Sequence, residues 1–260
     1  MTDSEEKQIP LLGSTNRKLA VFSGNTIKSV KKAACSADDL EKLELNGAET
    51  LVISVRPDLK EIAVKKPKVC FFDPDLACNK YGIRGFYKEM GTDRLANLVG
   101  AIGMFPQHSL GVLDFGTCTT LTYLSFSPEN KVYEYIKGYI LPGISSSLKA
   151  LQSDTTSLPK ITEMDFIEYC LSWKPSMVAK TPKASICDGM INSSLLLVQD
   201  AINFAKKEAS KNKKAPFKII ITGGWAVTIQ SCLNKLELDT RTTIEANLTL
   251  LGGNFYQRNT

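Results

Sequence analysis

The sequence predicts an α/β protein of two lobes, because strand hairpins followed by helices occur twice along the chain. A length of 260 residues agrees with this, since it suits one large domain or two intimate lobes. Glycine turns follow apolar strands at residues 13–15, 116–117 and 222–224. We expect lobes at residues 1–105 and 106–260, with a boundary inside 91–110 and the glycine turns facing a shared cleft.

In the first lobe, a short apolar run at residues 9–12 ends at a turn-like cluster. Strands are then predicted at residues 17–22, 26–34, 50–55 and 69–72, with a hairpin turn at 23–25. Two helix starts follow from capping residues. Ser36 has Asp39 three residues later, and Thr92–Asp93 is expected to cap a helix that runs to about Phe105.

In the second lobe, residues 110–113 form a predicted strand that leads into the turn at Gly116. Strands at 121–126 and 132–136 are expected to pair antiparallel around residues 127–130. A further strand at 217–221 leads into the last glycine turn. Helices are predicted from about Ser145 and, with an amphipathic pattern, at 190–209.

The composition excludes several classes of protein. With 43% hydrophobic residues the chain can bury a core, which excludes wholesale disorder. No apolar run approaches the roughly 20 residues of a membrane span, and the charged start lacks the apolar segment of a signal peptide. The seven cysteines include no CxxC pair, so we expect reduced thiols and a cytoplasmic protein.

The net charge of +5 comes with short basic clusters, which we interpret as a solvated surface. These clusters are not interleaved with aromatic residues, so nucleic-acid binding is not expected. The single histidine, His108, excludes histidine-rich zinc sites. No GxSxG motif accompanies it, which argues against a Ser-His-Asp hydrolase. We interpret His108 as a surface loop residue.

The glycine turns are candidates for phosphate binding. Glycine lets backbone N–H groups approach a phosphate closely, and a neighbouring hydroxyl, as at Thr117, adds a donor. Asp114, at a strand end, is placed to hold a cation or a water beside the phosphates. One such turn is usually only a turn, but a nucleotide cleft needs several together. The chain has neither a Walker A motif nor a GxGxxG after a strand.

Longer motifs resemble those of type III pantothenate kinases, over nearly the whole chain and most clearly from Gly91 onward. That family has the elements GxDR(x)AN, DFGTATT, GGxIxPG, TGG, LxLxG and SVxP. The matching segments here are Gly91-Thr92-Asp93-Arg94-Leu95-Ala96-Asn97, Asp114-Phe115-Gly116-Thr117-Cys118-Thr119-Thr120, residues 138–143, Thr222-Gly223-Gly224, residues 247–252 and residues 50–57.

The resemblance implies an actin-like, ribonuclease H-like fold, a duplicated two-lobe kinase. It implies ATP-dependent phosphorylation of the primary hydroxyl of pantothenate to 4'-phosphopantothenate, which begins coenzyme A biosynthesis. Such a transferase would use ATP, Mg²⁺ and a monovalent cation, K⁺ or NH₄⁺, and would work as a homodimer. Its partners would be pantothenate and nucleotide, with no nucleic acid and no membrane.

The matching positions also imply roles for single residues. Asp93 corresponds to the general base and Asp114 to the ligand of the monovalent cation. A carboxylate suits a base, since it can orient an alcohol and phosphoryl transfer needs mainly positioning, although Asp93 alone would be read as a helix N-cap. The substrate-binding residues implied are Gly91, Thr92, Asp93, Arg94, Tyr87 and Thr181. The ATP-binding residues implied are Gly13, Ser14, Thr15, Lys18, Gly116, Thr117, Gly223 and Gly224.

The first phosphate loop departs from the family's DxGNT. Alignment on Gly13, which we prefer, puts Leu11 at the aspartate position. A second register on Gly24 keeps GNT and puts Phe22 there. In both registers the carboxylate is missing. Its loss should lower catalysis severely unless another group organises the cation.

Smaller departures concern three other motifs. Lys137 replaces the first glycine of GGxIxPG. Arg84 stands at the spacing of the family's tyrosine, with Phe86 and Tyr87 close by. Thr181 is the nearest match to a substrate-contacting threonine, at a spacing one residue too long.

Two other functions therefore stay open. Leu11 favours a catalytically impaired or inactive paralogue that acts as a small-molecule-binding or regulatory protein. The imperfect tyrosine and threonine matches favour a kinase of the same fold that acts on another alcohol. An assay of ADP release with pantothenate would discriminate among the three.

Overall fold

The computed structural model describes residues 6–12, 16–24, 26–34, 50–55, 61, 68–211, 215–236 and 242–258. The chain forms two compact units. Unit 1 contains Met1–Gln107, Glu129–Tyr135 and Asn247–Thr260, and unit 2 contains His108–Pro128 and Ile136–Ala246. The main division lies after Gln107, close to the expected boundary at residue 105. Two later segments, Glu129–Tyr135 and Asn247–Thr260, also belong to unit 1, so one cut in the chain does not separate the two units.

Unit 1 is built on a sheet with the order β3-β2-β1-β4-β5. β1 pairs antiparallel with β2, and β2 with β3, whereas β4 and β5 are added in parallel. Gly24, with a φ of 62°, turns the chain between β2 and β3, as the sequence predicts. The helix expected from Ser36 lies outside the described residues. The strands are β1 (Glu6–Leu12), β2 (Asn16–Ser23), β3 (Thr26–Ala34), β4 (Thr50–Ser54) and β5 (Val69–Phe71).

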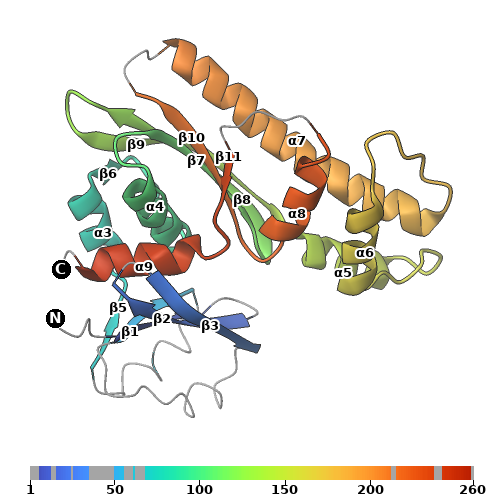
Figure 1. Ribbon diagram of the computed structural model, residues 1–260, viewed down its shortest axis with the longest axis horizontal. Coiled ribbons are helices and arrows are strands. Elements are labelled where there is room, and N and C mark those ends of the chain that lie inside the picture. The colour runs from blue at the N-terminus through green and yellow to red at the C-terminus, as the bar shows by residue number, and fades with distance from the viewer. Residues whose placement is uncertain are drawn as a thin grey trace. The chain divides into compact units, whose positions relative to one another are not determined.

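Three helices complete unit 1: α3 (Pro74–Tyr81), α4 (Thr92–Met104) and α9 (Leu248–Arg258). α9 lies between α4 and the sheet (Figure 1). Glycine allows this close approach, because a Cβ at Gly252 would overlap the carbonyl oxygen of Ala96. On its other face, a Cβ at Gly253 would lie 2.8 Å from Cδ1 of Ile53. The closing LxLxG motif thus holds α4 against the sheet.

The second sheet has the order β11-β10-β7-β8-β9-β6. Within unit 2, β10 pairs in parallel with β7 and β11, and β7 pairs antiparallel with β8. In unit 1, β6 (Ile83–Arg84) pairs with the first residues of β9. The other strands are β7 (Ser109–Phe115), β8 (Cys118–Ser127), β9 (Val132–Pro142), β10 (Phe217–Thr222) and β11 (Thr242–Ile244).

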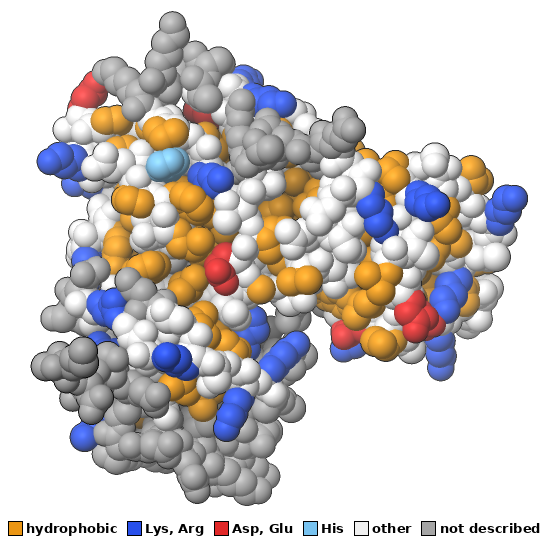
Figure 2. Space-filling model, viewed as in Figure 1, with side chains coloured by type: hydrophobic (Ala, Val, Ile, Leu, Met, Phe, Trp, Pro, Cys, Tyr) orange, Lys and Arg blue, Asp and Glu red, His pale blue; other side chains and the backbone are white. Residues whose placement is uncertain are grey.

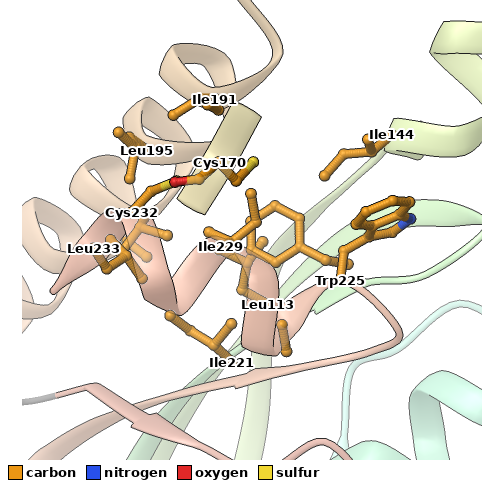
Figure 3. Packing of buried hydrophobic residues seen from close by; sticks show 14 of the residues in the cluster. Leu113, Ile144, Cys170, Ile191, Leu195, Ile221, Trp225, Ile229, Cys232 and Leu233 are labelled. Carbon is orange, nitrogen blue, oxygen red and sulfur yellow. The ribbon is translucent and has the colours of Figure 1, made fainter. Parts of the chain in front are cut away.

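The helices of unit 2 are α5 (Ile144–Asp154), α6 (Glu163–Ser172), α7 (Pro182–Lys211) and α8 (Ala226–Leu233). The amphipathic helix expected at 190–209 is confirmed, and it begins earlier, at Pro182. These helices and the sheet enclose a hydrophobic core that includes Leu113, Cys170, Ile191 and Ile229 (Figure 3). Burial of such side chains is the main source of stability for a unit of this size.

The surface carries no dominant charged area on the face shown in Figure 2, where lysine and arginine side chains of the described residues are scattered. In the part of the chain that the structure describes, no helix combines the length and apolar character needed to cross a membrane. The cysteines within the described ranges, from Cys70 to Cys232, all carry free thiols.

Candidate functional site

The residues of unit 2 that are predicted to bind phosphate lie at the ends of two parallel strands. β7 and β10 run side by side, with Asp114 level with Thr222. Each strand ends in a glycine turn, at Gly116–Thr117 and at Gly223–Gly224. The carboxyl ends of parallel strands meet at one edge of a sheet, which is where α/β proteins bind ligands. Two of the three predicted glycine turns are therefore neighbours, with Asp114 between them.

The carboxylate of Asp114 is enclosed by these two turns. Gly223 has a φ of 96°, a conformation that side chains rarely adopt. A Cβ at Gly223 would collide with Oδ1 of Asp114 and would lie 2.6 Å from the carbonyl oxygen of Phe115. A Cβ at Gly116 would lie 3.2 Å from the same Oδ1. The carboxylate thus leaves no room for a side chain at Gly223 and little room for one at Gly116.

A third segment, the start of α5, packs on the turn at Thr117. The N–H of Gly143 donates to the carbonyl oxygen of Thr117 over 3.0 Å, and Oγ of Ser146 donates to the same oxygen over 2.8 Å. A Cβ at Gly143 would overlap the carbonyl oxygens of Gly116 and Thr117. The Pro142–Gly143 motif therefore packs directly against the turn at Gly116–Thr117.

The chemistry of this site suits a hard cation. Carboxylate and carbonyl oxygens are the ligands of K⁺-like and Ca²⁺-like ions, and Asp114 lies beside the carbonyl of Phe115. Within the described ranges, no three His, Cys, Asp or Glu side chains cluster as a metal site would need. A cation here would thus depend on Asp114, backbone carbonyls and the phosphates of a bound nucleotide.

Asp93, the predicted general base, lies in the first turn of α4. The prediction that Thr92–Asp93 caps this helix is wrong: Gly91 is the N-cap, without a side-chain capping bond. Asp93 is already helical, and its Oδ1 accepts the neighbouring N–H of Arg94 over 2.8 Å. Burial raises the pKa of the Asp93 carboxyl, and that hydrogen bond and the charge of Arg94 offset part of the rise. A carboxylate with a raised pKa is suited to accept a proton.

Arg94 and Tyr87 form a cluster next to Asp93. Arg94 as a residue is only 6% exposed, and its guanidinium donates from Nη1 to the hydroxyl of Tyr87 and lies 5.9 Å from the centre of that ring. The ring of Tyr87 meets that of Tyr135 edge-on, at 6.2 Å between centres. Among the aromatic residues near the expected tyrosine position, the structure therefore brings Tyr87 to Arg94.

The first phosphate loop, Gly13–Thr15, lies outside the described residues. Leu11, on β1, is described: it is half-buried and stands opposite Lys18 on β2 and Ile53 on β4. Gly24, the glycine of the second register, makes the β2–β3 turn, and its carbonyl accepts a hydrogen bond from Nδ2 of Asn254 over 3.2 Å. Phe22, which the second register aligns with the family's aspartate, is fully buried.

Thr181, the remaining substrate-side residue, belongs to unit 2 and is exposed. Its Oγ1 accepts the N–H of Ala184 over 3.1 Å, which is the arrangement of a helix cap at the start of α7. Its role toward a substrate stays a prediction.

Three residues without a predicted role lie in these clusters: Gly143, Tyr135 and Trp225, whose backbone N–H donates to the carbonyl oxygen of Phe115 over 3.1 Å. Gly143 stands in a motif that was matched, and Pro-Gly after an apolar strand is a signal of close backbone approach. Trp225 follows the TGG turn directly, so its position in the chain pointed to the site. Tyr135 lies 48 residues from Tyr87 in the sequence and gave no such signal.

Comparison with solved structures identifies the fold. The chain resembles ethanolamine utilization protein EutJ from Carboxydothermus hydrogenoformans with a TM-score of 0.50 and 12% identity, over 97% of this chain and 90% of that one. The likeness concerns the fold alone. The predicted actin-like α/β fold of two units is confirmed.

Two relatives illustrate the similarity in sequence. Type III pantothenate kinase 1 of Francisella tularensis subsp. holarctica (strain OSU18) is 38% identical over 138 residues, which are 53% of this chain and 48% of the relative. The match thus spans about half the length of that relative. Type III pantothenate kinase of Legionella pneumophila (strain Corby) is 31% identical over 219 residues, 82% of this chain and 76% of the relative.

A family model described as type III pantothenate kinase matches residues 12–203. This range includes α4, β7 and β8, together with α5, α6 and most of α7. The match covers more than half of the chain and contains both the Asp93 and the Asp114 segments. The chain belongs to the type III pantothenate kinase family.

Proposed function

We propose that this chain phosphorylates pantothenate with ATP, as a transferase of coenzyme A biosynthesis. The observation that carries the proposal is the cluster at the start of α4. There, the half-buried Asp93, whose carboxyl has a raised pKa, adjoins the buried Arg94, whose guanidinium donates to the hydroxyl of Tyr87. Pantothenate offers a carboxylate and a primary hydroxyl, the groups that a guanidinium and a base would recognise.

In this mechanism Asp93 accepts the proton of the hydroxyl as that oxygen attacks the γ-phosphorus of ATP. Arg94 and Tyr87 hold the substrate so that the hydroxyl stays near the base. Phosphoryl transfer depends mostly on such positioning and on neutralisation of charge. The raised pKa of Asp93 means that proton transfer to it is less uphill than transfer to an ordinary aspartate.

The phosphate side supplies the rest of the chemistry. Backbone N–H groups of Thr117 and Gly223–Gly224 would face phosphate oxygens, as glycine turns at strand ends do, whereas the N–H of Gly116 donates to the carbonyl oxygen of Cys118 over 3.1 Å and shapes the turn. Asp114 would hold a monovalent cation, K⁺ or NH₄⁺, with the carbonyl of Phe115 close by. Mg²⁺, when bound with ATP, neutralises charge on the transferred group. Leu11 offers no ligand to it.

The proposal is tested by an ADP-release assay with pantothenate, ATP and Mg²⁺, with and without K⁺. We expect turnover that requires pantothenate and a monovalent cation, and that Asp114→Ala removes the K⁺ dependence. Asp114→Asn is the matched control, because it keeps the shape between the two turns and removes the charge. K⁺ activation that survives in Asp114→Ala would remove this residue from the cation site.

A second function is favoured by Leu11, which leaves the first phosphate loop without a carboxylate. In that case the chain binds pantothenate or a related small molecule without turnover and serves regulation. The same assay separates the two functions: no ADP release, combined with pantothenate binding in calorimetry, would support the binding protein.

The family also supports proposals on assembly and location. We propose a homodimer, for which the exposed apolar side chains of β9, Tyr139, Ile140 and Leu141, offer contact area. Light scattering would measure the mass. The free thiols of the described cysteines agree with a cytoplasmic location, which cell fractionation would test.

A further inference from the structure

A chain of hydrogen bonds links three turns of unit 2. The indole Nε1–H of Trp225 donates to Oγ of Ser145 over 3.1 Å, and that hydroxyl donates to Oε1 of Glu163 over 2.5 Å. An indole N–H only donates and a hydroxyl has one proton, so the direction runs from Trp225 to the carboxylate. The chain joins the beginnings of α8, α5 and α6.

Trp225 is anchored in two other ways. Its backbone N–H donates to the carbonyl oxygen of Phe115, at the end of β7, over 3.1 Å. Its ring, which is 8% exposed, meets the ring of Phe166 edge-on, with 5.5 Å between centres. In Figure 3 it lies at the margin of the core near Ile144, and its nitrogen points away from the other labelled side chains. Backbone, ring and N–H thus contact β7, α6 and α5 respectively.

Ser145 is the residue through which Trp225 reaches the phosphate-side turns. It stands between Gly143 and Ser146, the two residues that donate to the carbonyl oxygen of Thr117. If Ser145 shifts, both donors shift with it, because all three belong to one turn of backbone at the start of α5. The indole N–H thus contacts the same turn of backbone that donates to Thr117.

We propose that Trp225 is a positioning residue for nucleotide binding. Acting through Ser145, it holds the start of α5 on Thr117 and so fixes the turn that surrounds Asp114. This inference rests on the proposed function only in taking these turns as the nucleotide side. It predicts that the surroundings of the indole change when Mg–ATP binds.

Two variants remove the link from opposite ends. Trp225→Phe keeps an aromatic ring against Phe166 and removes the N–H, whereas Ser145→Ala keeps the indole and removes its acceptor. Each should weaken Mg–ATP binding about three- to tenfold, the range of one neutral hydrogen bond, and leave pantothenate affinity unchanged. The double variant should bind no more weakly than the weaker single variant, since both changes break one link.

Trp173→Phe is the matched control. Its Nε1–H donates to Oδ1 of Asp188 over 2.7 Å, a contact in the same unit that involves none of the three turns. This variant should keep the wild-type affinity for Mg–ATP. The chain has 2 tryptophans, so in Trp173→Phe the fluorescence comes from Trp225 alone and should change on titration with Mg–ATP.

Calorimetric titration of Mg–ATP and of pantothenate into each variant gives the affinities. Equal loss of Mg–ATP affinity in Trp225→Phe and Trp173→Phe would overturn the inference, because it would indicate general loosening of unit 2. Additive losses in the double variant, or fluorescence that ignores Mg–ATP, would also overturn it. The readout is binding, so a selective loss in Trp225→Phe would support the inference even if the chain proves unable to phosphorylate pantothenate.

Discussion

The two candidate regions differ in the atoms that form them: mainly backbone atoms in unit 2, and side chains in unit 1. In unit 2 the turns predicted to bind phosphate are shaped mainly by backbone: glycines allow close approach, and carbonyl oxygens of Phe115 and Thr117 accept the bonds that join the turns, one of them from the Ser146 hydroxyl. In unit 1 the substrate-side cluster is made of side chains, Arg94, Tyr87 and Tyr135. Under the proposed function, backbone would recognise what all nucleotides share, whereas side chains would select one substrate.

This difference determines which substitutions should be harmful. A backbone cradle tolerates most changes of side chain, except where a glycine leaves no room for a Cβ or where a side chain holds a turn in place, as Trp225 does through Ser145. A side-chain cluster, in contrast, is sensitive to the loss of one functional group. The following variants test this contrast, beginning with the largest expected effect.

Asp93→Asn removes the proton acceptor and keeps size and shape, so we expect kcat to fall about 10²- to 10⁴-fold. Because the pKa of Asp93 is raised in the folded chain, ionisation above that pKa costs stability, and the neutral amide avoids this cost. The melting temperature at pH 7 should therefore be equal or higher. In the wild type, kcat/KM should fall with decreasing pH through a pKa above the ordinary 3.8 of aspartate.

Steady-state kinetics and thermal melting check both expectations. Unchanged kcat in a well-folded Asp93→Asn would exclude Asp93 as the base. An inflection at or below 3.8 would show that burial does not govern its ionisation.

Gly223→Ala should damage the phosphate side through backbone strain. The added Cβ would collide with the Asp114 carboxylate, and the φ of 96° adds strain, so we expect a loss of about 1–3 kcal/mol in stability. Mg–ATP affinity should fall more than about tenfold, equivalent to roughly 1.4 kcal/mol. Calorimetry and chemical denaturation measure the two effects.

Two other glycines provide the controls. Gly224 has open space around its Cβ position, so Gly224→Ala should change stability by no more than about 0.5 kcal/mol. Gly189, inside α7, also has open space around its Cβ position. Gly189→Ala should therefore raise the stability of the protein and leave Mg–ATP affinity unchanged. Equal effects of Gly223→Ala and Gly224→Ala on stability would refute the cradle.

Much of this architecture follows from local sequence. The strands that end in Gly116 and Gly223 were predictable because apolar runs stop at glycine, and α7 because its pattern is amphipathic. Helix α6 was missed although Thr162 and Asp165 form a capping box, a signal that the sequence does contain. The return of α9 to unit 1 was missed because no local pattern tells which helix will pack on α4.

The site divides in the same way. Asp93, Arg94, Asp114 and Gly223 lie in contiguous motifs and could be located from the sequence. The bond between Trp225 and Ser145 joins residues 80 positions apart, and the contact of Tyr87 with Tyr135 is also long-range. Such contacts depend on the packing of α5, α8 and β9, which periodicity does not predict.

Tyr87→Phe tests the substrate side with a smaller change. It removes the hydroxyl that accepts the Arg94 hydrogen bond and keeps the ring against Tyr135. Tyr87 is 39% exposed, so water partly replaces the lost bond and we expect KM for pantothenate to rise only about three- to tenfold. KM for ATP should not change. A rise in both KM values would contradict the separation of substrate and phosphate sides.

Leu11→Asp restores a carboxylate next to the first phosphate loop and should have the smallest effect. The new side chain would stand directly opposite Lys18 on β2, where cross-strand neighbours of opposite charge attract each other by about 0.2–1 kcal/mol. The new carboxylate would thus interact partly with Lys18, which would weaken its interaction with Mg²⁺. We expect Mg–ATP affinity to rise about two- to fivefold, with stronger dependence on Mg²⁺, since a charge-assisted contact gains at most a few kcal/mol and Lys18 competes for it. Stability should fall by about 1 kcal/mol, as for a typical point substitution. Leu11→Asn, polar but uncharged, is the matched control and should not gain affinity. Tight, Mg²⁺-dependent ATP binding by the unaltered chain, unchanged in Leu11→Asp, would contradict this expectation. It would show that another group already performs the role of the missing carboxylate, so that the turns of unit 2 bind Mg–ATP without a carboxylate at position 11.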